Sequence, residues 1–242
     1  MIRVGVFGAA GRMGATVCGA VEADPDLELV ARIDPSLSTT ADAEPEFDVA
    51  IDFTVVAAAR ENIRWCAANG VHAVVGTTGF SDDDLAEFRS LFTTSNCLIA
   101  PNFAIGAVLM MRFAELAAPW FETAEIIELH HDQKADAPSG TAMGTARRMA
   151  AASDQWAPDP TKHEVVVGAR GGSGPAGIHI HSVRLRGLVA HQEVLLGTQG
   201  ETLTIRHDSL DRSSFMPGVV LAAKKIAEFP GLTVGLEPFL GL

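Results

Sequence analysis

A glycine-rich turn near the N-terminus restricts the possible folds of this chain more than any other feature. Residues 2–7 are mostly apolar, as in a buried parallel strand, and Gly-Ala-Ala-Gly-Arg-Met-Gly follows at positions 8–14. A helical run to about Ala23 and a strand-like run over residues 27–33 come next, and Asp34 stands at the end of that second run. This is a βαβ unit, and it predicts a Rossmann-type domain.

The same turn predicts a dinucleotide site. Its glycines are spaced GxxGxxG rather than GxGxxG, and such turns also serve helix packing, but the flanking strand, helix and acidic residue favour binding. Asp34 is expected to accept hydrogen bonds from the adenosine ribose, which favours NADH, whereas Arg12 can meet the 2′-phosphate of NADPH. Binding of both cofactors is therefore expected. The residues expected to contact them here are Gly8, Ala9, Ala10, Gly11, Arg12, Met13 and Asp34.

Strands and helices continue to alternate after this unit, which is typical of a parallel sheet. The predicted strands are residues 48–53, 71–75 and 97–100. Thr54 is expected to cap a helix that Gly70 stops, and Ser81 with Asp84 to form the capping box of another. The loop Gly76-Thr77-Thr78-Gly79 follows a strand at its carboxyl end, where ligands bind in open parallel sheets.

The remaining chain predicts a second domain. Helices are expected at residues 105–121, about 139–152 and 213–229, and strands at 124–131, 164–167, 178–186, 192–196, 201–208 and 233–236. Turns that contain Gly187 and Gly200 favour antiparallel pairing. The predicted fold is α/β. A dinucleotide-binding domain (1–104 and 213–242) is joined, through hinges near Ala104 and Arg212, to a substrate-binding and oligomerisation domain (105–212). That second domain is expected to be α+β, with a mixed, mainly antiparallel sheet.

A short loop before the helix at residue 139 concentrates the groups that can do chemistry. Free N–H groups at the helix start, with Gly140 and the Thr141 hydroxyl, suit a carboxylate or phosphate, and Lys134 adds a positive charge. His130 and His131 can exchange protons near neutral pH. Ser139 also has an ordinary interpretation as a helix N-cap. A metal site at His-His-Asp is the weaker interpretation, because adjacent residues cannot readily share one ion.

Composition excludes several classes of function. The formal net charge of −12 argues against a general nucleic-acid or membrane-surface binder. No apolar run reaches the length of a membrane span, and no signal peptide is expected. The three cysteines are scattered among apolar neighbours, as in proteins of a reducing compartment, so a cytoplasmic location is expected.

The loop sequence also carries a resemblance. Glu-Leu-His-His-x-x-Lys-x-Asp-Ala-Pro-Ser-Gly-Thr-Ala, at positions 128–142, resembles the signature of the dihydrodipicolinate (4-hydroxy-tetrahydrodipicolinate) reductase family of lysine and diaminopimelate biosynthesis. The family's glycine turn, Gly-Ala-x-Gly-Arg-Met-Gly, fits as well, and the predicted elements match along essentially the whole chain. The resemblance implies NAD(P)H-dependent reduction of the dehydrated form of 4-hydroxy-tetrahydrodipicolinate to tetrahydrodipicolinate.

The resemblance also implies roles for particular residues. His130 and Lys134 are the family's candidate general acids, with the donor between them left open. His131, Ser139, Gly140 and Thr141 are expected to bind the dicarboxylate. Two loops are expected to flank the nicotinamide and its ribose, namely Gly76, Thr77 and Thr78, and Ala100, Pro101, Asn102 and Phe103. Reductases of this family are homotetramers that join through the second sheet, and the strands over residues 178–208 carry enough apolar surface for such an interface.

Two other functions stay open at this point. One is another two-domain NAD(P)-dependent dehydrogenase of a small anionic substrate, and the 128–142 loop argues against it. The other is a non-catalytic NAD-sensing protein, which the presence of His130, Lys134 and Thr141 disfavours.

Overall fold

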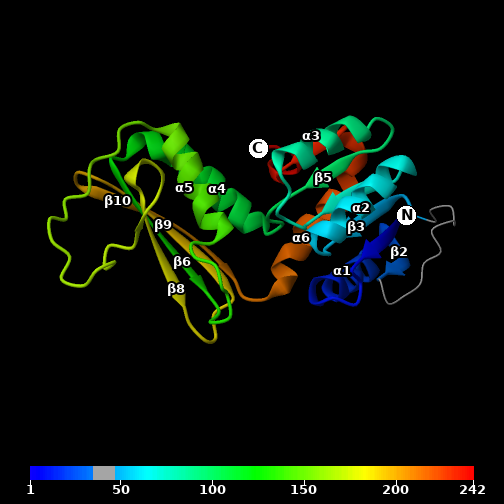
Figure 1. Cartoon of the computed structure of the whole chain (residues 1–242), viewed down its shortest axis with the longest axis horizontal. Coiled ribbons are helices and arrows are strands. Elements are labelled where there is room, and N and C mark those ends of the chain that lie inside the picture. Colours follow the sequence, from blue (N-terminus) through cyan, green and yellow to red (C-terminus); the bar gives the residue numbers. More distant parts are fainter. Residues whose placement is uncertain (35–46) are drawn as a thin grey trace. The chain divides into compact units, whose positions relative to one another are not determined.

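The computed structural model describes residues 1–34 and 47–242, which form two compact units (Figure 1). The first unit comprises Met1–Ile105 and Arg212–Leu242, and the second comprises Gly106–Asp211. The chain therefore leaves the first unit and returns to it, as the predicted last helix and strand require. Within the described residues, no helix combines the length and apolar character that a bilayer span requires.

The first unit is built on a six-stranded sheet with the order β11-β5-β4-β3-β1-β2, and all of its strand pairs are parallel. Its strands are β1 (Ile2–Phe7), β2 (Leu27–Ile33), β3 (Val49–Asp52), β4 (His72–Val75), β5 (Cys97–Ile99) and β11 (Leu232–Val234). The strand order reverses between β1 and β3, so loops at the carboxyl ends open onto a switch point of the kind that binds ligands. The Rossmann-type prediction is confirmed.

Helices of the first unit follow the predictions except at the Thr54 cap and over residues 213–229, where a shorter α-helix lies between two 3-10 turns. The helices are α1 (Arg12–Ala23), α2 (Val56–Ala68), α3 (Asp82–Leu91) and α6 (Met216–Lys225), with short 3-10 turns at Arg212–Phe215, Ile226–Glu228 and Glu237–Leu240. The Ser81–Asp84 capping box is present, and Gly70 ends α2 with a φ of 68°. The prediction for Thr54 is wrong. Val55 is the N-cap of α2, and the Thr54 hydroxyl donates to the Asp52 carboxylate at 2.7 Å.

The second unit contains a five-stranded sheet with the order β10-β9-β6-β8-β7. Its elements are α4 (Ile105–Ala117, which begins at the end of the first unit), a 3-10 turn (Ala118–Trp120), β6 (Thr123–His130), α5 (Gly140–Ala152), β7 (Gly172–Ser173), a 3-10 turn (Pro175–Gly177), β8 (His179–Arg184), β9 (Ala190–Thr198) and β10 (Glu201–Ser209). The sheet is mixed and mainly antiparallel, as predicted, because only β6 and β8 pair in parallel.

Two local predictions for this unit are wrong. Residues 164–167 form bends and the start of a turn rather than a strand, and their valines are exposed. The Glu164 carboxylate accepts hydrogen bonds from the N–H groups of Gly168 and Arg170, at 2.9 and 3.2 Å, which closes that turn. The strands on either side of the Gly187 turn do not pair with each other, because β6 lies between β8 and β9.

One face of this sheet packs against α5. Alternation along β6 and β9 turns Ile126, Val194 and Leu196 to the same side, where all three are buried. A direct polar contact ties helix and sheet together, because the Gln192 side chain donates to the Thr145 hydroxyl at 2.8 Å. The start of α5 and the end of β6 are thereby fixed on one rigid framework.

Candidate active site

The glycine turn between β1 and α1 leaves the start of that helix open to an anion. Gly8 has a φ of 77°, which favours glycine, and its carbonyl accepts a hydrogen bond from the Gly11 N–H at 2.9 Å. Among the described residues, no side chain caps α1 at Gly11, and no acidic residue lies in its first turn. The unpaired N–H groups at the helix start therefore suit a phosphate.

Asp34 holds this turn from the end of β2. Its carboxylate accepts a hydrogen bond from the Ala10 N–H, and the Gly8 N–H donates to the Ile33 carbonyl at 2.8 Å. Arg12 is exposed at the first position of α1, Ala9 is buried, and Met13 is half-buried. The glycine turn, the start of α1 and the Asp34 carboxylate therefore lie next to one another.

The loop after β4 is fixed by a buried carboxylate at the end of β3. Asp52, 2% exposed, accepts hydrogen bonds from the Asn62 amide at 2.6 Å and from the Thr54 N–H at 2.8 Å. The Thr77 hydroxyl lies 3.2 Å from this carboxylate and 2.9 Å from the Thr54 carbonyl, so it faces the protein interior. Thr78 is the residue of this loop whose side chain is exposed. Gly76 packs against the Phe53 ring.

The loop after β5 is partly core. Ala100 is buried, and its N–H donates to the Val75 carbonyl at 3.0 Å. Phe103 is buried too, with its ring centroid 5.7 Å from that of Phe53. Pro101 is exposed, and the Asn102 side chain accepts from the Ala104 N–H at 2.9 Å. The residues predicted to contact the cofactor thus gather at the carboxyl edge of one sheet.

The loop at residues 128–142 lies in the second unit and starts at the end of β6. His130 is the last strand residue, and its side chain is 15% exposed. Its Nδ1 contacts the Glu128 carboxylate, which is fully buried. Burial is the largest influence on His130 and lowers its pKa below the ordinary value. Glu128 opposes the fall, whereas Lys134 and Arg184 add to it.

Lys134 lies in the same loop and is held by a residue that sequence reasoning did not single out. Its Nζ lies 2.8 and 2.9 Å from the two carboxylate oxygens of Asp136, and its side chain is 21% exposed. His131 is exposed beyond the end of β6, and its Nδ1 accepts from the Gln133 N–H at 3.2 Å.

The start of α5 forms the other end of the loop. Ser139 is the N-cap, as its ordinary interpretation requires, and its hydroxyl accepts from the Ala142 N–H at 3.2 Å. Its own N–H donates to Glu128 at 3.2 Å. Gly140 is exposed with open space where a Cβ would lie, and Thr141 is half-buried beside it. One short loop therefore carries a histidine at its start, a lysine in its middle and a helix N-terminus at its end.

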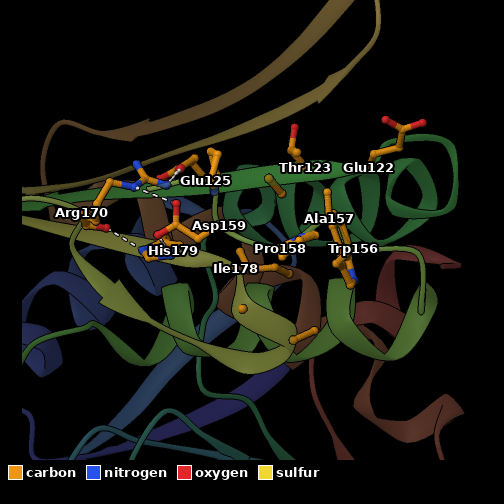
Figure 2. Close-up of a pocket in the computed structure, with 14 residues that line it drawn as sticks. Glu122, Thr123, Glu125, Trp156, Ala157, Pro158, Asp159, Arg170, Ile178 and His179 are labelled. Atoms are coloured by element: carbon orange, nitrogen blue, oxygen red, sulfur yellow. Dashed lines mark hydrogen bonds and ion pairs between the residues drawn. The ribbon is translucent and has the colours of Figure 1, made fainter. Parts of the chain in front are cut away.

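A hollow elsewhere in the second unit has no part in this arrangement (Figure 2). It is lined by the start of β6 and by residues 156–160 and 176–179, among others, and four of its polar side chains form ion pairs with one another. Arg170 lies 2.5 Å from Glu125 and 3.5 Å from Asp159, and His179 lies 3.2 Å from Asp159 (Figure 2). The described residues that line it include none of the predicted site residues.

Known protein families match both parts of the chain. Residues 2–103 match the model of the dihydrodipicolinate reductase N-terminus, and residues 106–240 match that of its C-terminus. The chain belongs to the dihydrodipicolinate reductase family. The C-terminal family model runs on through α6 and β11, which the structure places in the first unit.

Individual relatives of this family agree over full length. The 4-hydroxy-tetrahydrodipicolinate reductases of Mycolicibacterium vanbaalenii and Nocardia farcinica are 53% and 55% identical to the chain, and the alignments cover all of it and 100% and 99% of those proteins. A dipicolinate-bound dihydrodipicolinate reductase from a Paenisporosarcina species superposes with a TM-score of 0.88 at 42% identity, over 98% of this chain and 99% of that one. The predicted family and oxidoreductase class are confirmed, and the two alternatives are not favoured.

A more distant likeness shows the fold alone. An amine dehydrogenase from Mycobacterium smegmatis superposes with a TM-score of 0.61 at 15% identity, over 96% of this chain and 94% of that one. The two-domain fold is therefore shared beyond the reductase family.

Sequence reasoning missed several residues that organise the reductase loop. Glu128 left a signal, because it stands between Ile126 and His130 on the inward side of an alternating strand, where a charge is unusual. Arg184 left none. It reaches Glu128 only because β8 pairs in parallel with β6, and that register is not encoded locally.

Proposed function

We propose that this chain catalyses the NAD(P)H-dependent reduction of the dehydrated form of 4-hydroxy-tetrahydrodipicolinate to tetrahydrodipicolinate, in the cytoplasm. The observation that carries the proposal is the loop at residues 128–142. It holds a half-buried histidine, a lysine and an exposed glycine at a helix start within one short segment of a reductase-family chain. The dipicolinate bound to the Paenisporosarcina relative is a cyclic dicarboxylate, which supports a substrate of that class here.

The first unit is proposed to hold the dinucleotide. Its fit is supported by the uncapped start of α1 for the pyrophosphate and by Asp34 and Arg12 beside it for the adenosine ribose. The exposed Thr78 and the loop from Pro101 to Asn102 would border the nicotinamide end. When bound, the reduced cofactor supplies a hydride, that is, one proton and two electrons.

The second unit is proposed to bind the substrate and supply the proton. The start of α5 at Gly140 and Thr141 would take one carboxylate, and Lys134 with His131 would meet the rest of the dicarboxylate. The hydride reduces the ring's carbon–carbon double bond and leaves a negative charge, which one proton from His130 or Lys134 neutralises. The products are then tetrahydrodipicolinate and the oxidised cofactor.

The activity itself is the first prediction. The purified protein is expected to oxidise NADH, and NADPH as well, only when the product of dihydrodipicolinate synthase is generated in the same cuvette. Calorimetric titration of each reduced cofactor measures its affinity separately. Binding without turnover would contradict the proposed reaction, and a failure to bind either cofactor would contradict the proposed role of the first unit.

A variant of Asp34 sharpens the cofactor assignment. Asp34→Asn keeps an oxygen that can accept the Ala10 hydrogen bond but removes the negative charge. Loss of a charge-assisted ribose contact is expected to weaken NADH about tenfold, whereas NADPH binding holds or improves because the phosphate meets less repulsion. An equal loss for both cofactors would mean that Asp34 acts only on the turn.

Assembly gives a further prediction, and we propose a homotetramer. The face of the second sheet that turns away from α5 carries half-buried Ile127, Leu129, Val183 and Leu195 between ion pairs. An apolar face of this kind favours association. Light scattering is expected to give about four times 25.5 kDa at micromolar concentration. A monomer there would contradict the proposal.

A further inference from the structure

One buried carboxylate organises the loop at residues 128–142. Glu128 is fully buried on β6, and both of its oxygens accept hydrogen bonds from the Arg184 guanidinium, at 2.8 and 2.9 Å. The same two oxygens also accept from the Ser139 N–H at 3.2 Å and contact His130 Nδ1. Burial opposes ionisation of Glu128, but hydrogen bonds from Arg184, Ser182 and His130 outweigh it and hold the pKa of the carboxyl below its ordinary value.

The contacts of Glu128 lead to both candidate proton donors and to the helix start, whereas His131 lies outside them. Arg184 also donates to the Asp136 carbonyl at 2.6 Å, and the Asp136 carboxylate holds Lys134. Ser139 caps α5, whose first turn contains Gly140 and Thr141. A single charged group thus connects the histidine, the lysine and the helix start.

We propose that Glu128 is the positioning residue of this site, which fixes the His130 imidazole with Nδ1–H toward the interior and Nε2 toward the substrate. The inference rests on the proposed function only where it names His130 as the proton donor. The contact between the two side chains belongs to the resting protein and can be tested without substrate.

The contact between Glu128 and His130 Nδ1 determines which nitrogen of the imidazole carries the proton. Neutral imidazole carries one N–H, and a carboxylate can only accept, so the proton in the contact lies on Nδ1. When His130 takes up a second proton, that proton lies on Nε2. It can pass from there to the substrate while the Nδ1–H bond to Glu128 stays in place. Glu128 remains ionised throughout, and Arg184 balances its charge.

The charges around His130 set the pH range in which it can donate. Glu128 on β6 stabilises the imidazolium, whereas Arg184 on β8 and Lys134 on the following loop destabilise it. Ala190, which lies opposite His130 on β9, is uncharged. A donor must be protonated, so turnover is lost as pH rises through the pKa of His130. Removal of the negative charge at Glu128 lowers that pKa and shifts the loss to lower pH.

The same strand offers a matched control. Glu125 lies on the opposite face of β6 and makes the same kind of trio, with His181 Nε2 at 2.5 Å and Arg170 at 2.5 Å. Glu125→Gln therefore removes the same charge from a second, more exposed Glu–His–Arg cluster, which contains no proposed site residue.

The experiment compares wild type, Glu128→Gln and Glu125→Gln. Nitrogen NMR of labelled histidine reports the tautomer and pKa of His130, identified by the signal that His130→Asn removes. Wild-type His130 is expected to be the Nδ1–H tautomer. Glu128→Gln is expected to lower the pKa of His130 by about 1 or more. It is also expected to lower kcat about 10- to 100-fold with KM near wild type, and to shift the pH profile downward. Glu125→Gln is expected to leave the His130 pKa, kcat, KM and the pH profile unchanged.

Several results would overturn the inference. An Nε2–H tautomer in the wild type would do so without any variant, which covers the case in which Glu128→Gln does not fold. An unchanged His130 pKa with an unchanged pH profile in Glu128→Gln would leave Glu128 a purely structural role. If the chain bound cofactor but did not reduce the substrate, the proposed function would fail. The NMR measurement would still decide whether Glu128 positions His130.

Discussion

Replacement of Lys134 by alanine is expected to lower kcat/KM for the cyclic dicarboxylate about 30- to 1,000-fold while the Kd for NADH stays close to wild type. A positioned positive donor near the developing negative charge contributes on the order of 2–4 kcal/mol to transition-state stabilisation. The Lys134 ammonium is pre-oriented by the bidentate contact with Asp136. Its loss should therefore affect turnover and substrate affinity together.

Steady-state kinetics with separate calorimetric titration of NADH measures both quantities. Lys162→Ala is the matched control, because it makes the same change in net charge at an exposed lysine of the same unit that has no place in the site. Near-normal turnover in Lys134→Ala, or loss of NADH binding instead, would show that the substrate does not lie on this loop.

The parts of the fold that the sequence predicted are those in which a local signal has no competitor. The βαβ unit follows from an apolar run, a glycine turn and a helical run, and the Ser81 capping box follows from two residues three positions apart. Thr54 shows the limit of such reasoning. Its hydroxyl is a plausible cap, but the buried carboxylate of Asp52, two residues earlier, provides a stronger acceptor.

Strand predictions failed where side chains or distant segments decided the outcome. Three consecutive valines favour a strand at 165–167, yet the Glu164 carboxylate closes a turn there by bonding two backbone N–H groups. The insertion of β6 between β8 and β9 depends on pairing between segments far apart in sequence, which a single sequence does not reveal.

The candidate site divides in the same way. The polar residues of the loop from His130 to Thr141 were predictable because their residue types alone indicate what they can do. A helix start binds anions, lysine carries a positive charge, and histidine exchanges protons near neutral pH. The residue that holds them together was not, because Glu128 acts through Arg184 on a strand whose register is non-local. A charge on the buried side of an alternating strand is the one signal that sequence reasoning could have used.

Replacement of Gly14 by alanine is expected to destabilise the first unit by about 3 kcal/mol and to weaken dinucleotide binding. A Cβ at this position would lie 2.0 Å from the Gly8 carbonyl oxygen and 2.8 Å from the Ala9 Cα. These are backbone atoms of the turn itself, so no side chain can move aside to relieve the clash. Helix α1 has to shift away from β1, and the uncapped N–H groups at its start shift with it.

Gly19 on the same helix supplies the control. A Cβ there meets nothing within 4 Å, so Gly19→Ala is expected to stabilise the protein by about 0.5–1 kcal/mol and to leave NADH affinity unchanged. Thermal unfolding should show Gly14→Ala melting about 6–12 °C below wild type and Gly19→Ala slightly above it. If Gly14→Ala melted and bound NADH like wild type, the close approach of α1 to the turn would not be what shapes the cofactor site. The spacing of the third glycine would then have to be explained by another contact.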